Sequence, residues 1–89
     1  MIEKNITIVN KLGLHARAAA KLVHTASGHA SEVLIRKNGQ EVNGKSIMGV
    51  MMLAAEQGAQ VAVRAEGEDA DAAIEAMISL LESTFEGQT

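Results

Sequence analysis

Hydrophobic residues follow two different spacings along this 89-residue chain. Short runs of β-branched and alternating apolar positions are typical of strands, and they predict four strands, at residues 6–9, 32–37, 40–43 and 61–65. Apolar residues three and four positions apart are typical of amphipathic helices, and they predict helices over residues 16–26, 47–55 and from about residue 70 onward. The predicted order of elements is therefore β-α-β-β-α-β-α.

Residues with special backbone preferences mark the ends of these elements. Asn38-Gly39 favours the positive φ angles of a type I′ turn, so the strands on either side of it should form a hairpin. We expect Gly28 to end the first helix, Ser46 to cap the second, Gly58 to close it, and Asp69 to cap the third. Residues 87–89 are expected to fray.

Two apolar stripes supply most of the predicted core. The first helix carries Ala19, Leu22, Val23 and Ala26, and the third carries Ile74, Met77, Ile78, Leu81 and Phe85. All three helices need an apolar surface, and one small sheet can offer it. The sequence predicts an α+β fold, an open-faced β-sandwich with a four-stranded antiparallel sheet covered on one side by three helices. At this length we expect a single domain over residues 1–89.

Composition excludes several classes of function. A net charge of −3 and a single aromatic residue argue against nucleic-acid binding, which needs clustered cations and stacking platforms. No apolar run approaches the length of a spanning helix, so membrane insertion is not expected. The first residues lack the pattern of a signal peptide and the chain has no cysteine, which together favour a cytoplasmic location.

His15 and Arg17 stand where the first strand gives way to the first helix. The first N–H groups of a helix have no backbone acceptor and carry the positive end of its dipole, so they stabilise a bound anion. A neutral imidazole nitrogen can attack phosphorus, and an arginine two residues on can neutralise phosphoryl oxygens. A solvated histidine beside a solvated arginine is the other interpretation of so short a pattern.

Two longer motifs favour the first interpretation. Residues 10–17, Asn-Lys-Leu-Gly-Leu-His-Ala-Arg, and residues 45–51, Lys-Ser-Ile-Met-Gly-Val-Met, resemble the histidine-containing phosphocarrier (HPr) family, including its nitrogen-related NPr branch. The resemblance spans nearly the whole chain and implies the same open-faced fold. It implies that His15 is the phosphoryl acceptor, through Nδ1, and that Arg17 stabilises the phosphate. Ala18 departs from the proline that the family usually has there.

The resemblance also implies partners in the phosphoenolpyruvate-dependent phosphotransferase system. Enzyme I would donate the phosphoryl group and enzyme IIA proteins would accept it, for either sugar transport or nitrogen regulation. The chain would be a carrier rather than an enzyme with its own turnover, most simply a monomer, and it would need no cofactor and no metal. The family's contact positions correspond to Ala16, Arg17, Ala20, Lys21, Ile47, Met48 and Met51.

The start of the second helix carries two further expectations. Ser46 should act as an N-cap, and in one branch of the family the matching serine is phosphorylated by HPr kinase/phosphorylase, so regulation at Ser46 depends on whether such a kinase exists. Ile47, Met48, Met51 and Met52 are more apolar than a short helix can hide. We expect about half of them in the core and half on an adaptable docking surface.

The remaining histidines and the cluster of acidic residues are not expected to form a catalytic or metal site. His24 and His29 are expected on the surface without metal, and the acidic residues between 66 and 71 in a solvated loop. Two other functions stay open: a regulatory protein-binding module acting through Ser46 and the Met-rich helix, and an ACT-like ligand-binding domain. Replacing His15 by alanine distinguishes them from a carrier, because only the carrier needs that nucleophile.

Overall fold

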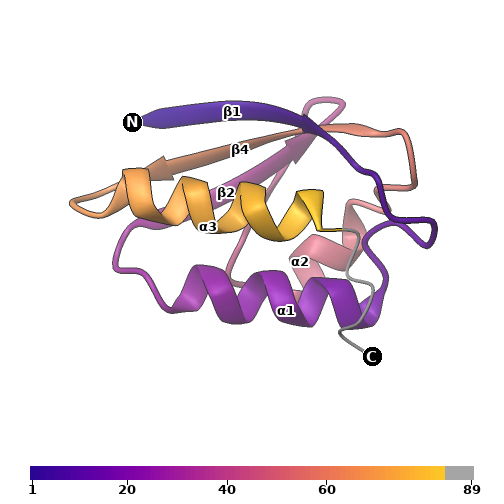
Figure 1. Cartoon of the computed structure of the whole chain (residues 1–89), viewed down its shortest axis with the longest axis horizontal. Helices are drawn as coiled ribbons and strands as arrows, with labels where there is room; N and C mark the ends of the chain where they lie inside the picture. Colours follow the sequence, from indigo (N-terminus) through magenta and orange to yellow (C-terminus); the bar gives the residue numbers. More distant parts are fainter. Residues whose placement is uncertain (84–89) are drawn as a thin grey trace.

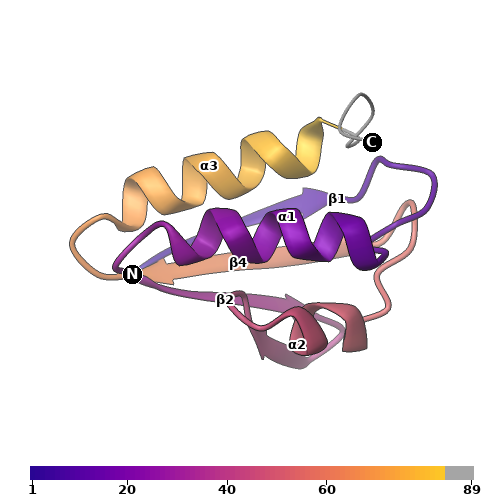
Figure 2. The same ribbon diagram turned by 90° about the horizontal axis from the view of Figure 1, so that it is seen from below.

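The computed structural model describes residues 1–83, and its elements follow the predicted order (Figure 1). They are β1 (Ile2–Thr7), α1 (Ala16–Ser27), β2 (Glu32–Lys37), β3 (Gln40–Asn43), α2 (Ile47–Met52), β4 (Gln60–Glu66) and α3 (Ala70–Glu82). The strands form one antiparallel sheet in the order β1-β4-β2-β3. α1 and α3 lie side by side over one face of it, and α2 packs against α1 and β3 (Figure 2). The predicted open-faced α+β sandwich is confirmed.

The core lies between the sheet and the two long helices. Alternate residues of β2 and β4 face the helices, so Val33, Ile35, Val61 and Val63 are buried. The helices contribute Ala18, Ala19, Leu22 and Ala26 from α1, and Ala73, Ile74, Met77 and Leu81 from α3. The predicted stripes are thus the buried faces, although Val23 and Ile78 are only partly buried. Phe85 and residues 87–89 lie outside the described residues.

The predicted hairpin is present between β2 and β3. Lys37 pairs with Gln40, and the two residues between them, Asn38 and Gly39, have φ angles of 52° and 84°. Both values lie in the left-handed region that a type I′ turn requires, and asparagine and glycine tolerate it best. The local sequence was sufficient here because the turn chemistry sets the register of both strands.

β1 lies nearer the N-terminus than predicted. It runs from Ile2 to Thr7 and pairs along its length with β4, from Ile2 opposite Ala65 to Thr7 opposite Gln60. Ile8 leaves the strand but remains buried, and its N–H donates to the Ala59 carbonyl at 2.8 Å. The prediction was wrong because the partner strand, rather than the run of β-branched residues, determines where β1 begins and ends.

α2 ends at Met52 instead of continuing to residue 55, and Gly58 does not close it. The carbonyls of Leu53 and Ala54 accept hydrogen bonds from Lys37 Nζ at 3.3 and 3.1 Å, while the Ala55 carbonyl accepts one from the Leu14 N–H at 2.8 Å. Ala54 adopts a positive φ of 52°. Contacts from distant parts of the chain therefore terminate this helix.

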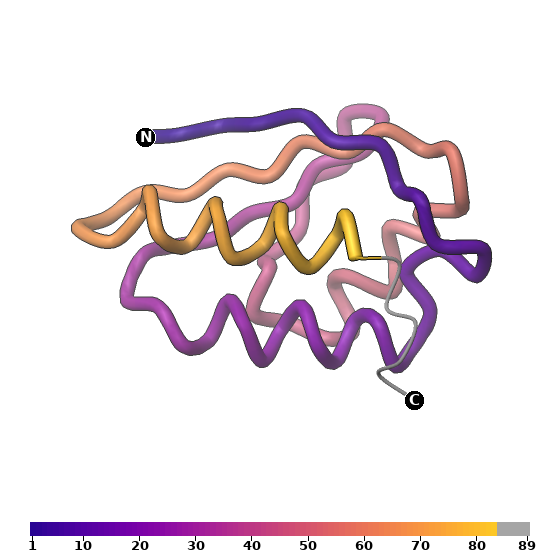
Figure 3. Tube along the Cα trace, viewed as in Figure 1, coloured from indigo at the N-terminus to yellow at the C-terminus, as the bar shows by residue number. Residues whose placement is uncertain are grey.

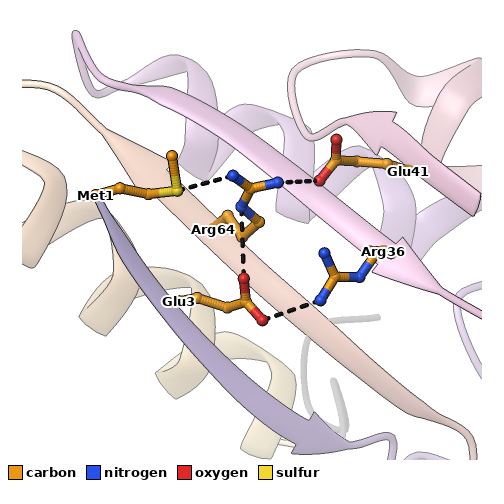
Figure 4. Close-up of polar contacts among 5 residues, drawn as sticks. All are labelled: Met1, Glu3, Arg36, Glu41 and Arg64. Carbon is orange, nitrogen blue, oxygen red and sulfur yellow. Dashed lines mark hydrogen bonds and ion pairs between the residues drawn. The ribbon is translucent and has the colours of Figure 1, made fainter. Parts of the chain in front are cut away.

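The face of the sheet opposite the helices carries a network of charged side chains (Figure 4). Glu3 bridges two arginines, with 3.0 Å to Arg36 Nη2 and 3.5 Å to Arg64 Nε. Arg64 also reaches Glu41 at 2.8 Å and the Met1 sulfur at 2.8 Å. The two carboxylates lie on the edge strands β1 and β3 and the two arginines on the central strands β4 and β2, and these pairs of opposite charge stabilise the solvent-facing side of the sheet.

Asp69 occupies the N-cap position of α3, but its side chain does not cap that helix. Its carboxylate instead accepts hydrogen bonds from the Ala30 and Ser31 N–H groups, both at 2.9 Å, and from the Ser31 hydroxyl. The Ser31 hydroxyl bond and then the Ala30 bond lower the pKa of Asp69 to about 2. Glu66, Glu68 and Asp71 are exposed as predicted, whereas Asp69 joins two loops.

Candidate functional site

His15 is the N-cap residue of α1. Its backbone is extended, with φ −73° and ψ 178°, and its carbonyl accepts the first helical hydrogen bond from Ala19 at 2.8 Å. The imidazole is half-buried and makes no capping bond to the backbone. It therefore stands at the positive end of the helix dipole with its ring free of that structural task.

Hydrogen bonds join the loop before α1 to the loop that follows α2, and Figure 3 shows the two segments side by side. The Leu14 N–H donates to the Ala55 carbonyl at 2.8 Å, and the buried Asn10 amide donates to the Gly13 carbonyl. Gly13 has φ +65°, and a Cβ there would lie 2.3 Å from the Ala55 oxygen. Asn10 and Gly13 belong to the motif of residues 10–17, but the contact with the distant Ala55 cannot be predicted from that motif.

The first turn of α1 presents backbone donors beside His15. The earliest helical bond is made by Ala19, so the N–H groups of Ala16, Arg17 and Ala18 precede it without an acceptor inside the helix. A proline at position 18 would remove one of these donors. Ala18 is fully buried, and the helix begins regularly without proline.

Positive charge collects around this end of the molecule. Between Lys4 and Ser31 the chain has three Lys and Arg residues, Lys11, Arg17 and Lys21, and no Asp or Glu, although its net charge is −3. Within residues 1–83, the ion pairs include neither Arg17 nor Lys21. Both line a groove of about 470 Å3 between α1 and α3, together with Ala20, His24, Thr25 and Leu80. An anionic partner would meet uncompensated cations here.

Ser46 caps α2 as predicted. Its hydroxyl accepts a hydrogen bond from the Gly49 N–H at 3.1 Å, and its backbone is extended. Figures 1 and 2 both place α2 beside the N-terminal half of α1, so Ser46 and His15 begin two neighbouring helices.

Ile47, Met48, Met51 and Met52 form an exposed surface that we call the apolar patch. Their exposed fractions are 43%, 69%, 40% and 65%. The expectation that about half of them are in the core was wrong, because Val50 and Leu53 make the buried contacts of this segment. Leu12, in the loop before His15, is also 75% exposed, which its position in the sequence did not reveal.

The other histidines of α1 and its following loop lie away from the start of the helix. His24 is exposed, and His29 Nδ1 lies 3.0 Å from the Thr25 carbonyl. Among the described residues there is no group of three His, Cys, Asp or Glu side chains that could hold a metal ion.

Comparison with known proteins identifies the family. Residues 2–83 match the family described as "PTS HPr component phosphorylation site". The chain belongs to the HPr family. It is 52% identical to the phosphocarrier protein HPr of Xylella fastidiosa over 89 residues, which is the full length of both chains.

Solved HPr structures agree with the architecture. The crystal structure of HPr from Thermoanaerobacter tengcongensis is 49% identical, covers 96% of both chains and superposes with a TM-score of 0.92. A second structure, described as an HPr dimer from the same organism, covers 96% of this chain and 98% of its own, with a TM-score of 0.77 and 49% identity.

Family membership establishes the general role. HPr proteins are phosphocarriers of the phosphotransferase system, and the chain is such a carrier rather than an independent catalyst. In the part of the chain that the structure describes, the helices are too short or too polar to cross a membrane.

Proposed function

We propose that His15 accepts a phosphoryl group from enzyme I and passes it to enzyme IIA proteins. The observation that carries the proposal is the position of its half-buried imidazole at the start of α1, beside three N–H groups that precede the first helical bond. A ring nitrogen attacks phosphorus, the N–P bond forms as the bond from phosphorus to the donor breaks, and onward transfer reverses the exchange. The helix terminus stabilises the phosphoryl oxygens at both stages.

Arg17 neutralises these oxygens during transfer. Its side chain is exposed, it lies in the first turn of α1 two residues after His15, and the ion pairs within residues 1–83 do not include it. Its guanidinium can therefore turn toward a phosphoryl group without breaking a structural contact. Because Ala18 leaves its N–H in place, we expect the replacement of proline to change the rate or partner preference and not to abolish transfer.

Both partners bind what we call the docking face: Ala16, Ala20, Lys21, Ile47, Met48 and Met51. The small alanine side chains let a partner approach α1 closely, and Lys21 attracts acidic surfaces. The three apolar side chains of α2 are 40% exposed or more. Flexible methionines can adapt to partners of different shape. A surface that must release two partners quickly needs only a small interface.

Ser46 is a regulatory site where a dedicated HPr kinase/phosphorylase is present. Its half-buried hydroxyl lies directly before the apolar residues of α2. Phosphorylation would add about two negative charges beside the docking face and would weaken the approach of an acidic partner. We further propose that the carrier works in the cytoplasm, where phosphoenolpyruvate is made, and as a monomer, although a related HPr is described as a dimer.

A relay experiment tests this function. Labelled phosphoenolpyruvate, magnesium, enzyme I and an enzyme IIA protein are mixed with a substoichiometric amount of the chain. We expect label on the IIA protein that is lost with His15→Ala and retained with His24→Ala, which removes an exposed histidine from the same helix. Unlabelled IIA with the wild-type chain would favour the regulatory binding module instead.

A further inference from the structure

We propose that Met48, Met51 and Met52 form a redox-sensitive modification site. Oxidation of their thioethers to sulfoxides by hydrogen peroxide or a similar two-electron oxidant would reversibly weaken the docking of phosphotransferase partners. The inference rests on the proposed docking face, which contains two of these residues.

These three methionines are both exposed and grouped in one helix. Three of its five methionines lie in the six residues of α2, and they are 69%, 40% and 65% exposed. Met77 is fully buried in α3. Met1 is 71% exposed, but it lies against Arg64 on the face of the sheet opposite the helices, away from the docking face. The chain has no cysteine, so no thiol competes for the oxidant.

The chemistry needs only the oxidant. The sulfur takes one oxygen atom from hydrogen peroxide and loses two electrons, and the rest of the peroxide leaves as water. A methionine sulfoxide reductase reverses the step at the expense of a dithiol. The fold should survive, because Val50 and Leu53 attach this segment to the core while the three methionines are at least 40% exposed.

The modification acts on recognition. A thioether loses little when a partner covers it, whereas a sulfoxide is polar and must give up its bonds to water. Two or three sulfoxides in the apolar patch should therefore slow phosphorylation by enzyme I about tenfold at limiting carrier concentration, a loss of about 1.4 kcal/mol.

The test uses the full chain before and after treatment with hydrogen peroxide. Peptide mass spectrometry locates each added oxygen, thermal melting checks the fold, and phosphorylation by enzyme I gives the rate. The matched variant carries Leu at positions 48, 51 and 52, which keeps apolar side chains but cannot be oxidised. It retains Met1 and Met77, so it reports oxidation elsewhere, and its untreated rate is its own reference.

We expect oxidation at residues 48 and 52 well before Met77, and a slowed wild-type chain that sulfoxide reductase restores. The treated variant should stay within about twofold of its untreated rate. Equal slowing of wild type and variant, an unslowed wild type that carries the sulfoxides, or loss of the folded state would overturn the proposal. An untreated wild type that accepts no phosphate would instead overturn the proposed function, and the redox site with it.

Discussion

Asp69 and Ser31 are joined across 38 residues of chain. The Asp69 carboxylate accepts the Ser31 N–H at 2.9 Å and also the Ser31 hydroxyl, while its second oxygen accepts the Ala30 N–H. Ser31 is buried, and it precedes β2 as Asp69 precedes α3. One ionised carboxylate therefore holds the loop between α1 and β2 to the start of α3.

This contact predicts a specific pH dependence of stability. The folded pKa of Asp69 is about 2, below its ordinary value of 3.8, so the unfolded chain takes up the proton first. The contribution is fully present above about pH 4 and is lost as the pH falls through the folded value. Asp69→Asn should melt at a lower temperature at neutral pH and lose part of the acid dependence. Melting temperatures of both proteins from neutral pH to about pH 2 measure this dependence. A melting temperature that falls equally with pH in the two proteins would contradict the prediction.

Gly13→Ala should destabilise the chain by about 2 kcal/mol or more. The alanine would have to adopt a left-handed φ, and its Cβ would clash with the Ala55 carbonyl. Urea denaturation measures the loss. Gly39→Ala is the matched control: it has φ +84° and open space around the added Cβ, so it should cost only about 1 kcal/mol. Equal losses for the two variants would show that the contact with Ala55 is unimportant.

Arg17→Ala should slow phosphoryl transfer about 10- to 100-fold, because a charged donor to the phosphoryl oxygens is removed. Its stability should be nearly unchanged, since Arg17 is exposed and outside the ion pairs of residues 1–83. Transfer kinetics with phosphorylated enzyme I and a melting curve measure both. Arg36→Ala removes the same charge from the open face of the sheet, and equal slowing there would point to a general charge effect.

Ala18→Pro should leave a folded carrier, with stability changed by about 1 kcal/mol or less. The Ala18 N–H precedes the first helical bond, and proline is tolerated in the first turn of a helix. The transfer rate should change, because a donor near His15 is lost and Arg17 is constrained. Stopped-flow transfer rates for the two proteins check this, and identical rates would contradict it.

Local sequence predicted those parts of the fold that local chemistry determines. Asn38-Gly39 specified the hairpin, Gly28 the end of α1, and the Ser46 hydroxyl the start of α2. The candidate site could also be predicted from the sequence, because His15 and Arg17 are only two positions apart and their role depends on one helix terminus.

Other features depend on residues that are distant in sequence. Lys37 and Leu14 take up the carbonyls after Met52 and so shorten α2, and pairing with β4 shifts β1. Asp69 carries an ordinary N-cap pattern but bonds to Ser31 instead. Exposure of the apolar patch likewise depends on which face of α2 meets α1, and periodicity over six residues is too short to determine it.

The most direct test of the central claim is the intact mass of wild type, His15→Ala and His24→Ala after incubation with phosphoenolpyruvate, magnesium and enzyme I, before and after acid. The account predicts one acid-labile phosphate on wild type and His24→Ala and none on His15→Ala. A phosphate that persists on His15→Ala, or an unlabelled wild type beside phosphorylated enzyme I, would contradict it.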